Sequence, residues 1–283
     1  MPLPSDLARI TAHTRLFGVM GDPVTHSLSP LMHNAAFAQM GIDGVYVAFP
    51  VTDPADAVAG VRALNISGCS VTIPHKIAVM ELLDELEPSA RQIGAVNTIV
   101  NDNGRLIGFN SDSPGAMAAL LEKTPVTGKH AAVIGAGGAA RAVAYGIRQH
   151  GGRLTIVNRS RDKGRRLADE MGGTFIGPKE FTALGVDILV NTTSVGMTPE
   201  ADRMPVTGDC LRQGMTVMDI VYNPLETLLL RTAREAGCQV VDGVAMFVHQ
   251  GAIQFERWTG LRPPVQLMRE TVVDALRAAS VNQ

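Results

Sequence analysis

The sequence predicts an α/β fold of two domains, the second of them built on a doubly wound parallel sheet. Three observations predict this. With 283 residues, the chain is near the upper size for a single hydrophobic core. Short apolar runs alternate with helical patterns along most of its length, which is typical of parallel sheets. Aromatic residues make up only 4% of the chain against 29 glycines, and this mixture suits strands that are buried on both faces and joined by glycine-rich turns.

In the first 112 residues, strands and helices have clear start signals. Strands are expected at Leu16–Met20, Val45–Val51 and Gly68–Ile73, and helices at Ser29–Met40, Asp53–Leu64 and about Lys76–Leu86. Ser29 and Asp53 are the expected N-caps, because a proline follows each of them. Asn103-Gly104 predicts a hairpin turn between strands at Thr98–Val100 and Leu106–Phe109.

From residue 129 on, strands and helices alternate more regularly. Strands are expected at His130–Ile134, Leu154–Val157, Val186–Val190, Thr216–Val221 and Gln239–Val241, and helices at Arg161–Glu170, Leu225–Ala236, Phe247–Trp258 and Val265–Ala279. We therefore expect one domain at residues 1–112, completed by helices within 244–283, and a doubly wound domain at 113–243.

Charge and cysteine content exclude several classes of protein. The chain has 25 Lys and Arg against 27 Asp and Glu, with an isoelectric point near 6.4, so it is not a broadly basic nucleic-acid binder. Its three cysteines lack metal-ligand spacing, and neither a disulfide framework nor a metal site is expected. No secretory signal is expected, and no run comes near the roughly 18–20 apolar residues of a membrane span. We expect a cytoplasmic protein without a membrane partner.

A glycine-rich turn opens the helix that follows the strand at His130–Ile134. Its residues are Gly135, Ala136, Gly137, Gly138 and Ala139, and Ala140 comes next. The first glycine permits the tight turn, the second lets a pyrophosphate approach the backbone, and small Ala140 lets helix and strand pack closely. In this strand–turn–helix setting we expect a dinucleotide site of the Rossmann kind, although glycine turns also arise for structural reasons alone.

The end of the next strand indicates which dinucleotide binds. An NAD site would place an acid about 20 residues beyond the glycines, but the chain has Asn158, Arg159 and Ser160 there, with Lys163 behind them. Because cations pair with the 2′-phosphate of NADP, NADP is the expected cofactor. Asp162 keeps NAD open, and a solvated basic turn with Ser160 as a helix cap is the alternative interpretation.

Later segments add expected cofactor contacts. Thr192 and Ser194 follow a strand at its carboxyl end, where ligands of open α/β sheets bind, and Gly243 follows the last strand. An ordinary polar loop explains Thr192 and Ser194 nearly as well.

Polar side chains also collect at strand ends in the first domain. They are Ser27, Ser29, Thr72, Lys76, Asn97, Asn110 and Asp112, and Gln250 adds to them near the C-terminus. Hydroxyl and amide groups bind several hydroxyls of a ligand, while a lysine and an aspartate handle a proton. This set predicts a small polyhydroxylated acid as the substrate.

These segments resemble the shikimate dehydrogenase family over most of the chain. Seven motifs occur in the order in which the family has them: GDPVTHSLSP, VTIPHK, AVNT, GFNSD, GAGGAAR, NRS and VHQGA…WTG. The resemblance implies reversible NADP-dependent reduction of 3-dehydroshikimate to shikimate in aromatic amino acid biosynthesis. It implies that Lys76 and Asp112 are the catalytic pair. It further implies that the substrate is bound by Ser27 and Ser29 at its carboxylate, by Thr72, Asn97 and Gln250 at its hydroxyls, and by Tyr222 beside the ring or carboxylate.

Two departures from the family pattern leave the substrate open. Ser70 stands where members usually have Asn, and Ser111 alters the usual Asn-Thr-Asp to Asn-Ser-Asp. Ser70 still belongs to the expected substrate site, but its reach is shorter, so a paralogue acting on quinate or an amino-substituted analogue, with use of NAD, is the alternative. A non-catalytic NADP-binding regulator is a distant one, because both Lys76 and Asp112 are present. A homodimer stays open.

Each assignment also has a structural explanation. Ser29 and Asp112 are each suited to cap a helix. Lys76 at a helix start would ordinarily be a surface residue. Isolated His75 is more often structural than catalytic, and Tyr222 could serve packing alone.

Overall fold

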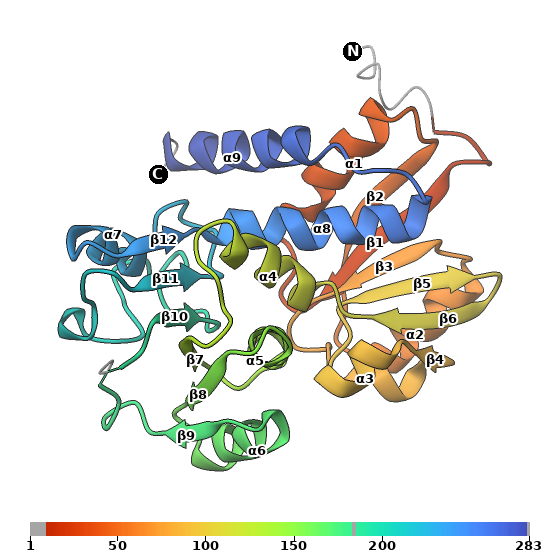
Figure 1. The fold of residues 1–283 in the computed structure, drawn as a ribbon. Helices are drawn as coiled ribbons and strands as arrows, with labels where there is room; N and C mark the ends of the chain where they lie inside the picture. Colours follow the sequence, from red (N-terminus) through yellow and green to blue (C-terminus); the bar gives the residue numbers. More distant parts are fainter. Residues whose placement is uncertain (1–9, 183–184, 282–283) are drawn as a thin grey trace. The chain divides into compact units, whose positions relative to one another are not determined.

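Two compact units make up the protein (Figure 1). The structure, a computed structural model, describes residues 10–182 and 185–281. Unit 1 contains residues up to Ser111 together with Gly251–Ala275, and unit 2 contains Asp112–Gln250 together with residues from Leu276 on. None of the helices in the described ranges is long and apolar enough to span a membrane.

Unit 1 is built on a mixed six-stranded sheet. Its strands are β1 (Arg15–Gly21), β2 (Gly44–Pro50), β3 (Gly68–Val71), β4 (Glu85–Leu86), β5 (Thr98–Asp102) and β6 (Arg105–Phe109), in the order β2-β1-β3-β5-β6-β4. Strand β1 pairs in parallel with β2 and β3, while β5 is antiparallel to β3 and β6. The carboxyl ends of β1, β3 and β6 and the amino end of β5 therefore meet at one edge of the sheet.

Helices complete unit 1. They are α1 (Ser29–Gln39), α2 (Pro54–Ala63), the 3-10 helix η2 (Ala78–Leu82), α3 (Pro88–Ile93), the second part of α8 (Gly243–Thr259) and most of α9 (Val265–Val281). Asp53 caps α2 as predicted, because its carboxylate accepts from the backbone N–H groups of Ala55 and Asp56. The Asn103-Gly104 hairpin turn is also confirmed, with φ angles of 51° and 91°, as a type I′ turn requires.

Two local predictions in unit 1 were wrong. Leu28, not Ser29, occupies the N-cap of α1, because its backbone (φ −87°, ψ 0°) is already helical, so Ser29 is the first residue of the helix. The helix expected at Lys76–Leu86 is replaced by a turn, η2 and β4. The Lys76 carbonyl accepts from the N–H of Val96 at 2.7 Å, and β4 pairs in parallel with β6. Hydrogen bonds and strand pairing with residues further along the chain thus replace the hydrogen bonds of a helix.

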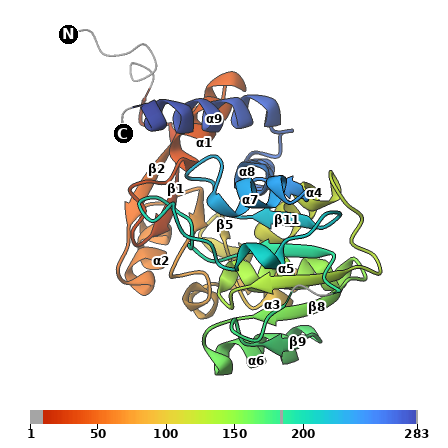
Figure 2. The same cartoon turned by 90° about the vertical axis from the view of Figure 1, so that its left-hand side faces the viewer.

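Unit 2 is a doubly wound parallel sheet (Figures 1 and 2). Its strands are β7 (His130–Ile134), β8 (Arg153–Val157), β9 (Thr174–Ile176), β10 (Ile188–Asn191), β11 (Thr216–Asp219) and β12 (Gln239–Val241). All pairs are parallel, in the order β12-β11-β10-β7-β8-β9. This is the Rossmann order, and it reverses between β7 and β10, where such sheets bind ligands.

Helices of unit 2 pack on both faces of this sheet. They are α4 (Asp112–Leu121), α5 (Gly138–Gln149), α6 (Arg161–Met171), α7 (Leu228–Glu235), the 3-10 helix η3 (Gly208–Cys210) and the first part of α8. Side chains of α4, α5 and α6 share one apolar core with one face of the sheet, and side chains of α7 share a second core with the other face. A Cβ at Gly146 would lie 2.7 Å from Met117 Cγ, so α4 and α5 need this glycine to pack.

Candidate functional site

Several predicted substrate residues lie together at the edge of the unit 1 sheet where β1, β3 and β6 end. Register sets Ser70 of β3 opposite Thr98 of β5, and Thr98 opposite Phe109 of β6. Asn97 and Ser111, which flank these paired positions, are therefore neighbours, and both are buried. Asn97 Oδ1 accepts from the backbone N–H of Ser111 at 2.7 Å, and Asn97 Nδ2 donates to Ser111 Oγ at 2.9 Å.

Ser70 belongs to a buried chain of hydrogen bonds. Tyr46 OH donates to Ser70 Oγ at 2.7 Å, and Ser70 Oγ donates to Gln254 Oε1 at 2.9 Å. Gln254 Nε2 in turn donates to the Asn97 carbonyl and to Thr98 Oγ1, both at 3.0 Å. Burial raises the pKa of Tyr46 well above its usual value, so this hydroxyl stays a donor. These two bonds use the proton and one of the two lone pairs of Ser70 Oγ.

Sequence reasoning missed Tyr46 and Gln254. A signal for Gln254 was present, because Gln250, Gln254 and Trp258 recur every four residues and so share one face of α8. Trp258 Nε1 donates to the Ile99 carbonyl at 3.0 Å. Nearby, His33 is fully buried and stacks on the Tyr46 ring with centroids 4.5 Å apart. Burial lowers the pKa of His33 to about 3, so this ring is neutral at physiological pH.

Ser27, Ser29 and Thr72 lie at the same edge of the sheet. Ser27 and Ser29 follow β1, and the backbone N–H of Ser29 donates to Ser27 Oγ at 3.3 Å. Thr72 follows β3, where a Cβ on Gly21 would lie 2.3 Å from Thr72 Cγ2. The close approach of Gly21, at the end of β1, therefore restricts the position of the Thr72 side chain.

The two residues of the predicted catalytic pair belong to different units. Lys76 is half-buried in the turn after β3 in unit 1. Asp112 is only 4% exposed and is the first residue of α4 in unit 2. His75 has a structural partner, because its Nε2 lies 2.6 Å from the Val51 carbonyl.

In unit 2, the glycine turn lies where the strand order reverses. Gly135 has a φ of +120°, and a Cβ there would lie 2.5 Å from Thr192 Oγ1, so only glycine fits. Thr192 Oγ1 donates to the Ile134 carbonyl at 2.6 Å and closes the turn. A Cβ on exposed Gly137 would meet open space. Packing therefore leaves Gly137 unexplained, whereas a pyrophosphate approaching the start of α5 explains it. Ala136, Gly138 and Ala139 complete this turn, and the geometry fits a dinucleotide.

The basic residues after β8 also take the expected positions. Asn158 Nδ2 donates to the Ser160 carbonyl at 2.8 Å, and Ser160 occupies the N-cap of α6. Arg159 and Lys163 are exposed. The described residues include no carboxylate at the end of β8, where an NAD site would have one.

A buried aspartate lies on the other side of the strand reversal. Its functional importance was not predicted from the sequence. Asp219, at the end of β11, accepts from Asn191 Nδ2 at 2.9 Å, from Thr227 Oγ1 at 2.8 Å and from the backbone N–H of Val221 at 3.0 Å. Burial raises its pKa to about 6, although these three bonds oppose the rise. Asn191 Oδ1 accepts from Thr193, so the pair holds the loop that carries Thr192 and exposed Ser194.

The remaining predicted residues have packing roles in unit 2. The Tyr222 ring lies 4.6 Å from that of Phe247, and Gln250 Nε2 donates to the Phe247 carbonyl at 2.8 Å. A Cβ on Gly243 would lie 2.4 Å from the Val221 carbonyl oxygen, so a close approach of backbone requires this glycine.

Three family models match the chain. They are the shikimate dehydrogenase substrate binding domain at residues 19–99, shikimate / quinate 5-dehydrogenase at 118–207 and the shikimate 5′-dehydrogenase C-terminal domain at 243–273. A shikimate dehydrogenase (NADP(+)) of Geobacillus kaustophilus is 47% identical over 274 residues, which cover 93% of this chain and 99% of that protein. This chain belongs to the shikimate dehydrogenase family. Its Ser70 and Gly135–Ala139 segments both fall within the matched ranges.

Solved structures of the shikimate dehydrogenase family have the same fold. A shikimate dehydrogenase in complex with NADP+ aligns with a TM-score of 0.91 and 42% identity over 94% of this chain and 97% of that one. A quinate dehydrogenase of Corynebacterium glutamicum in complex with NAD aligns with a TM-score of 0.85 and 32% identity over 92% of this chain and 99% of that one. Shikimate and quinate dehydrogenases thus both occur on this fold.

Proposed function

We propose that this protein catalyses the reversible NADP-dependent reduction of 3-dehydroshikimate to shikimate, a step of aromatic amino acid biosynthesis. The observation that carries the proposal is the identity of 47%, over nearly the full length of both chains, with a shikimate dehydrogenase (NADP(+)). The glycine turn at the strand reversal and the basic end of β8 support the choice of cofactor.

Lys76 and Asp112 are proposed as the catalytic pair. When bound, NADPH would supply a hydride to the carbonyl carbon of the substrate and become NADP+, while the carbonyl oxygen would gain the negative charge of an alkoxide. The Lys76 ammonium gives that oxygen a proton, which yields the hydroxyl of shikimate, and in the reverse direction Lys76 takes the proton back. The Asp112 carboxylate orients the ammonium. This assignment rests on the family motifs that contain the two residues.

The proposed substrate contacts follow the same motifs. Ser27 and Ser29 bind the carboxylate, and Tyr222 lies beside the ring or carboxylate. The hydroxyls are bound by Ser70, Thr72, Asn97 and Gln250. For Ser70, the network described above supports an acceptor role, because its proton is already donated to Gln254.

The proposed cofactor contacts lie in residues 113–243, and residues 1–112 with 244–283 are proposed as the substrate domain. The glycine turn Gly135–Ala139 holds the pyrophosphate, with Thr192, Ser194 and Gly243 nearby. The 2′-phosphate is bound by Asn158, Arg159, Ser160 and Lys163. The exposed guanidinium and ammonium groups of Arg159 and Lys163 support this assignment.

We also propose the cytoplasm as the compartment. Cys69, Cys210 and Cys238 are free thiols, which fits a reducing environment. The near-neutral charge supports a small molecule rather than nucleic acid as the partner.

Quinate with NAD is the second candidate. Its support is the similarity to a quinate dehydrogenase in complex with NAD and the shorter Ser70 side chain at an expected substrate position. A steady-state panel of shikimate, quinate and aminoshikimate against NADP and NAD separates the candidates. We expect the highest kcat/KM with shikimate and NADP. A higher kcat/KM with quinate or aminoshikimate would reject the proposed substrate, and no turnover with any pair would favour the non-catalytic regulator.

A further inference from the structure

A cavity of about 410 Å³ lies beside the ends of β8 and β9 in unit 2, and it is lined by Arg159, Gly177, Pro178, Lys179 and Glu180. These two strands are adjacent and parallel, with Val157 opposite Ile176. The residues that follow them leave the sheet side by side, so Arg159 from one loop and Lys179 from the next reach the same cavity. The first loop was expected to bind cofactor, whereas the second loop has no assigned role.

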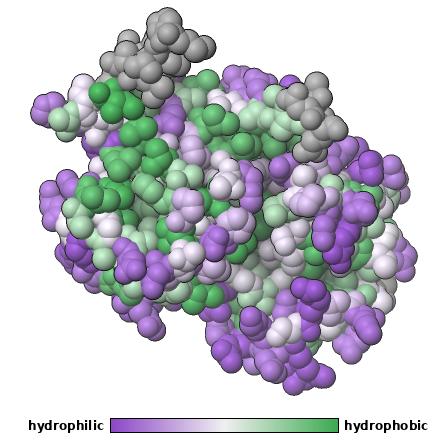
Figure 3. Space-filling view, turned by 180° about the vertical axis from the view of Figure 1, so that it is seen from behind, coloured by the Kyte–Doolittle hydropathy of each residue, from purple (hydrophilic) through white to green (hydrophobic). Residues whose placement is uncertain are grey.

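The lining of this cavity carries two basic side chains and one acidic side chain. Arg159 and Lys179 are exposed cations. Glu180 Oε2 accepts from the backbone N–H of Gly177 at 3.1 Å, so this carboxylate is turned toward its own loop. A Cβ on Gly177 would lie 2.8 Å from the same oxygen, so a larger residue at 177 would displace this carboxylate. Hydrophilic side chains crowd the lower part of Figure 3, where α6 and β9 lie.

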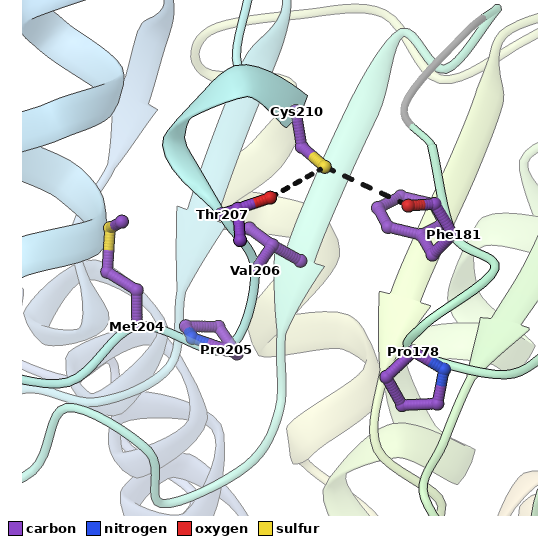
Figure 4. A pocket seen from close by; sticks show the side chains of 7 residues that line it. All are labelled: Pro178, Phe181, Met204, Pro205, Val206, Thr207 and Cys210. Atoms are coloured by element: carbon purple, nitrogen blue, oxygen red, sulfur yellow. Dashed lines mark hydrogen bonds between the residues drawn. The ribbon is translucent and has the colours of Figure 1, made fainter.

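The loop that carries Lys179 is anchored in the core. Phe181 is only 7% exposed and packs in the apolar cluster that includes Leu189 and Leu211. Phe181 and Pro178 also line an adjacent pocket of about 190 Å³, in which Cys210 Sγ lies 3.9 Å from the Phe181 carbonyl oxygen (Figure 4). Lys179 therefore has a defined place beside Arg159.

We propose that Lys179 is a second cation for the 2′-phosphate of NADP, which binds in this cavity together with Arg159. The inference rests on the proposed use of NADP. In a sheet of this order the pyrophosphate lies at the turn after β7, and the adenosine ribose reaches the end of β8. A dianionic phosphate there pairs with the planar Arg159 guanidinium and with the point charge of Lys179. Preference for NADP over NAD is then set by two loops rather than one.

Lys179→Met tests the inference, because it removes the charge and keeps the length of the side chain. We expect KM for NADP to rise about three- to tenfold, as befits one exposed charge pair, with kcat and KM for NAD unchanged. Lys179→Arg should keep most of the affinity. Lys123→Met, which removes an exposed lysine after α4, is the matched control and should change none of these constants.

Direct binding distinguishes this inference from the proposed function. Titration calorimetry with adenosine 2′,5′-bisphosphate and with adenosine 5′-monophosphate should show that Lys179→Met weakens only the bisphosphate. Equal weakening of both probes, or of neither, would overturn the role of Lys179 and leave the NADP assignment standing. A wild-type protein that binds both probes equally would overturn the NADP assignment and this inference together.

Discussion

At the residue scale, the hydrogen bonds of Ser70 show what a single sequence can and cannot predict. The motif around Ser70 places it correctly at the end of β3. Its partners are Tyr46 and Gln254, which lie 24 and 184 positions away. Nothing in local spacing links them, because the contacts come from the pairing of β1 with its neighbours and from the packing of α8. The motif locates Ser70 near the end of a strand, but only the fold shows which hydrogen bonds its hydroxyl group makes.

Gln254→Leu should be strongly destabilising. The amide of Gln254 satisfies Ser70 Oγ, the Asn97 carbonyl and Thr98 Oγ1, all of which are buried. Leucine would remove these three hydrogen bonds, each of which contributes about 0.5–1.5 kcal/mol to stability. We expect urea denaturation to show a loss of about 2–4 kcal/mol in the free energy of unfolding.

Gln266→Leu is the matched control for this prediction. Gln266 lies exposed on α9, and its Nε2 donates to Glu270 Oε1 on the same helix at 2.8 Å. Its replacement should change the free energy of unfolding by no more than about 0.5 kcal/mol. Equal effects of the two substitutions would contradict the role given to the Gln254 network.

At the element scale, prediction succeeded where local signals decide the structure. The hairpin turn at Asn103-Gly104 and the start of α2 at Asp53 depend on neighbouring residues, and both were predicted. The segment Lys76–Leu86 has helical periodicity, but its backbone bonds to Val96 and Leu106. Long-range pairing outweighed local preference there, and periodicity alone does not reveal this.

The free energy of unfolding depends on pH through Asp219, which lies at the end of β11 and binds Asn191 at the end of β10. Its pKa is about 6 in the folded protein and about 3.9 in an unfolded chain, so the folded state binds the proton more tightly. The free energy of unfolding therefore falls as pH rises from about 4 to 6, by about 3 kcal/mol from this group, and its contribution is constant above that range. Asp219→Asn should remove this fall.

Chemical denaturation of wild type and Asp219→Asn between pH 4 and 7 measures the difference. The free energy of unfolding of the variant should rise relative to that of wild type as pH rises through this range. The substitution Asp202→Asn, at an exposed position, controls for the loss of one carboxylate. A difference between Asp219→Asn and wild type that stays the same at every pH would show that Asp219 titrates alike in the folded and unfolded chain.

At the scale of the whole molecule, both sheets were predicted from the alternation of strands and helices, whereas helical periodicity does not mark where α8 passes from one unit to the other. The structure divides α8 after Gln250. Helical periodicity runs through this point without a break, because one continuous helix serves both units. The proposed catalytic pair draws on both units as well, since Lys76 belongs to the first and Asp112 to the second.

A double substitution tests whether Lys76 and Asp112 act as a pair. Lys76→Ala removes the proposed proton donor and should lower kcat by about 10²–10⁴-fold, with little change in the affinity for NADP. Asp112→Asn should lower kcat through the orientation of Lys76. If the two act as one unit, the double variant is about as slow as the slower single variant, because effects within a catalytic unit are not additive. Steady-state kinetics with shikimate and NADP measure kcat of all three variants.

Effects of the two substitutions that multiply would mean that the two residues act independently. Near-normal turnover of Lys76→Ala would show that Lys76 is not the proton donor.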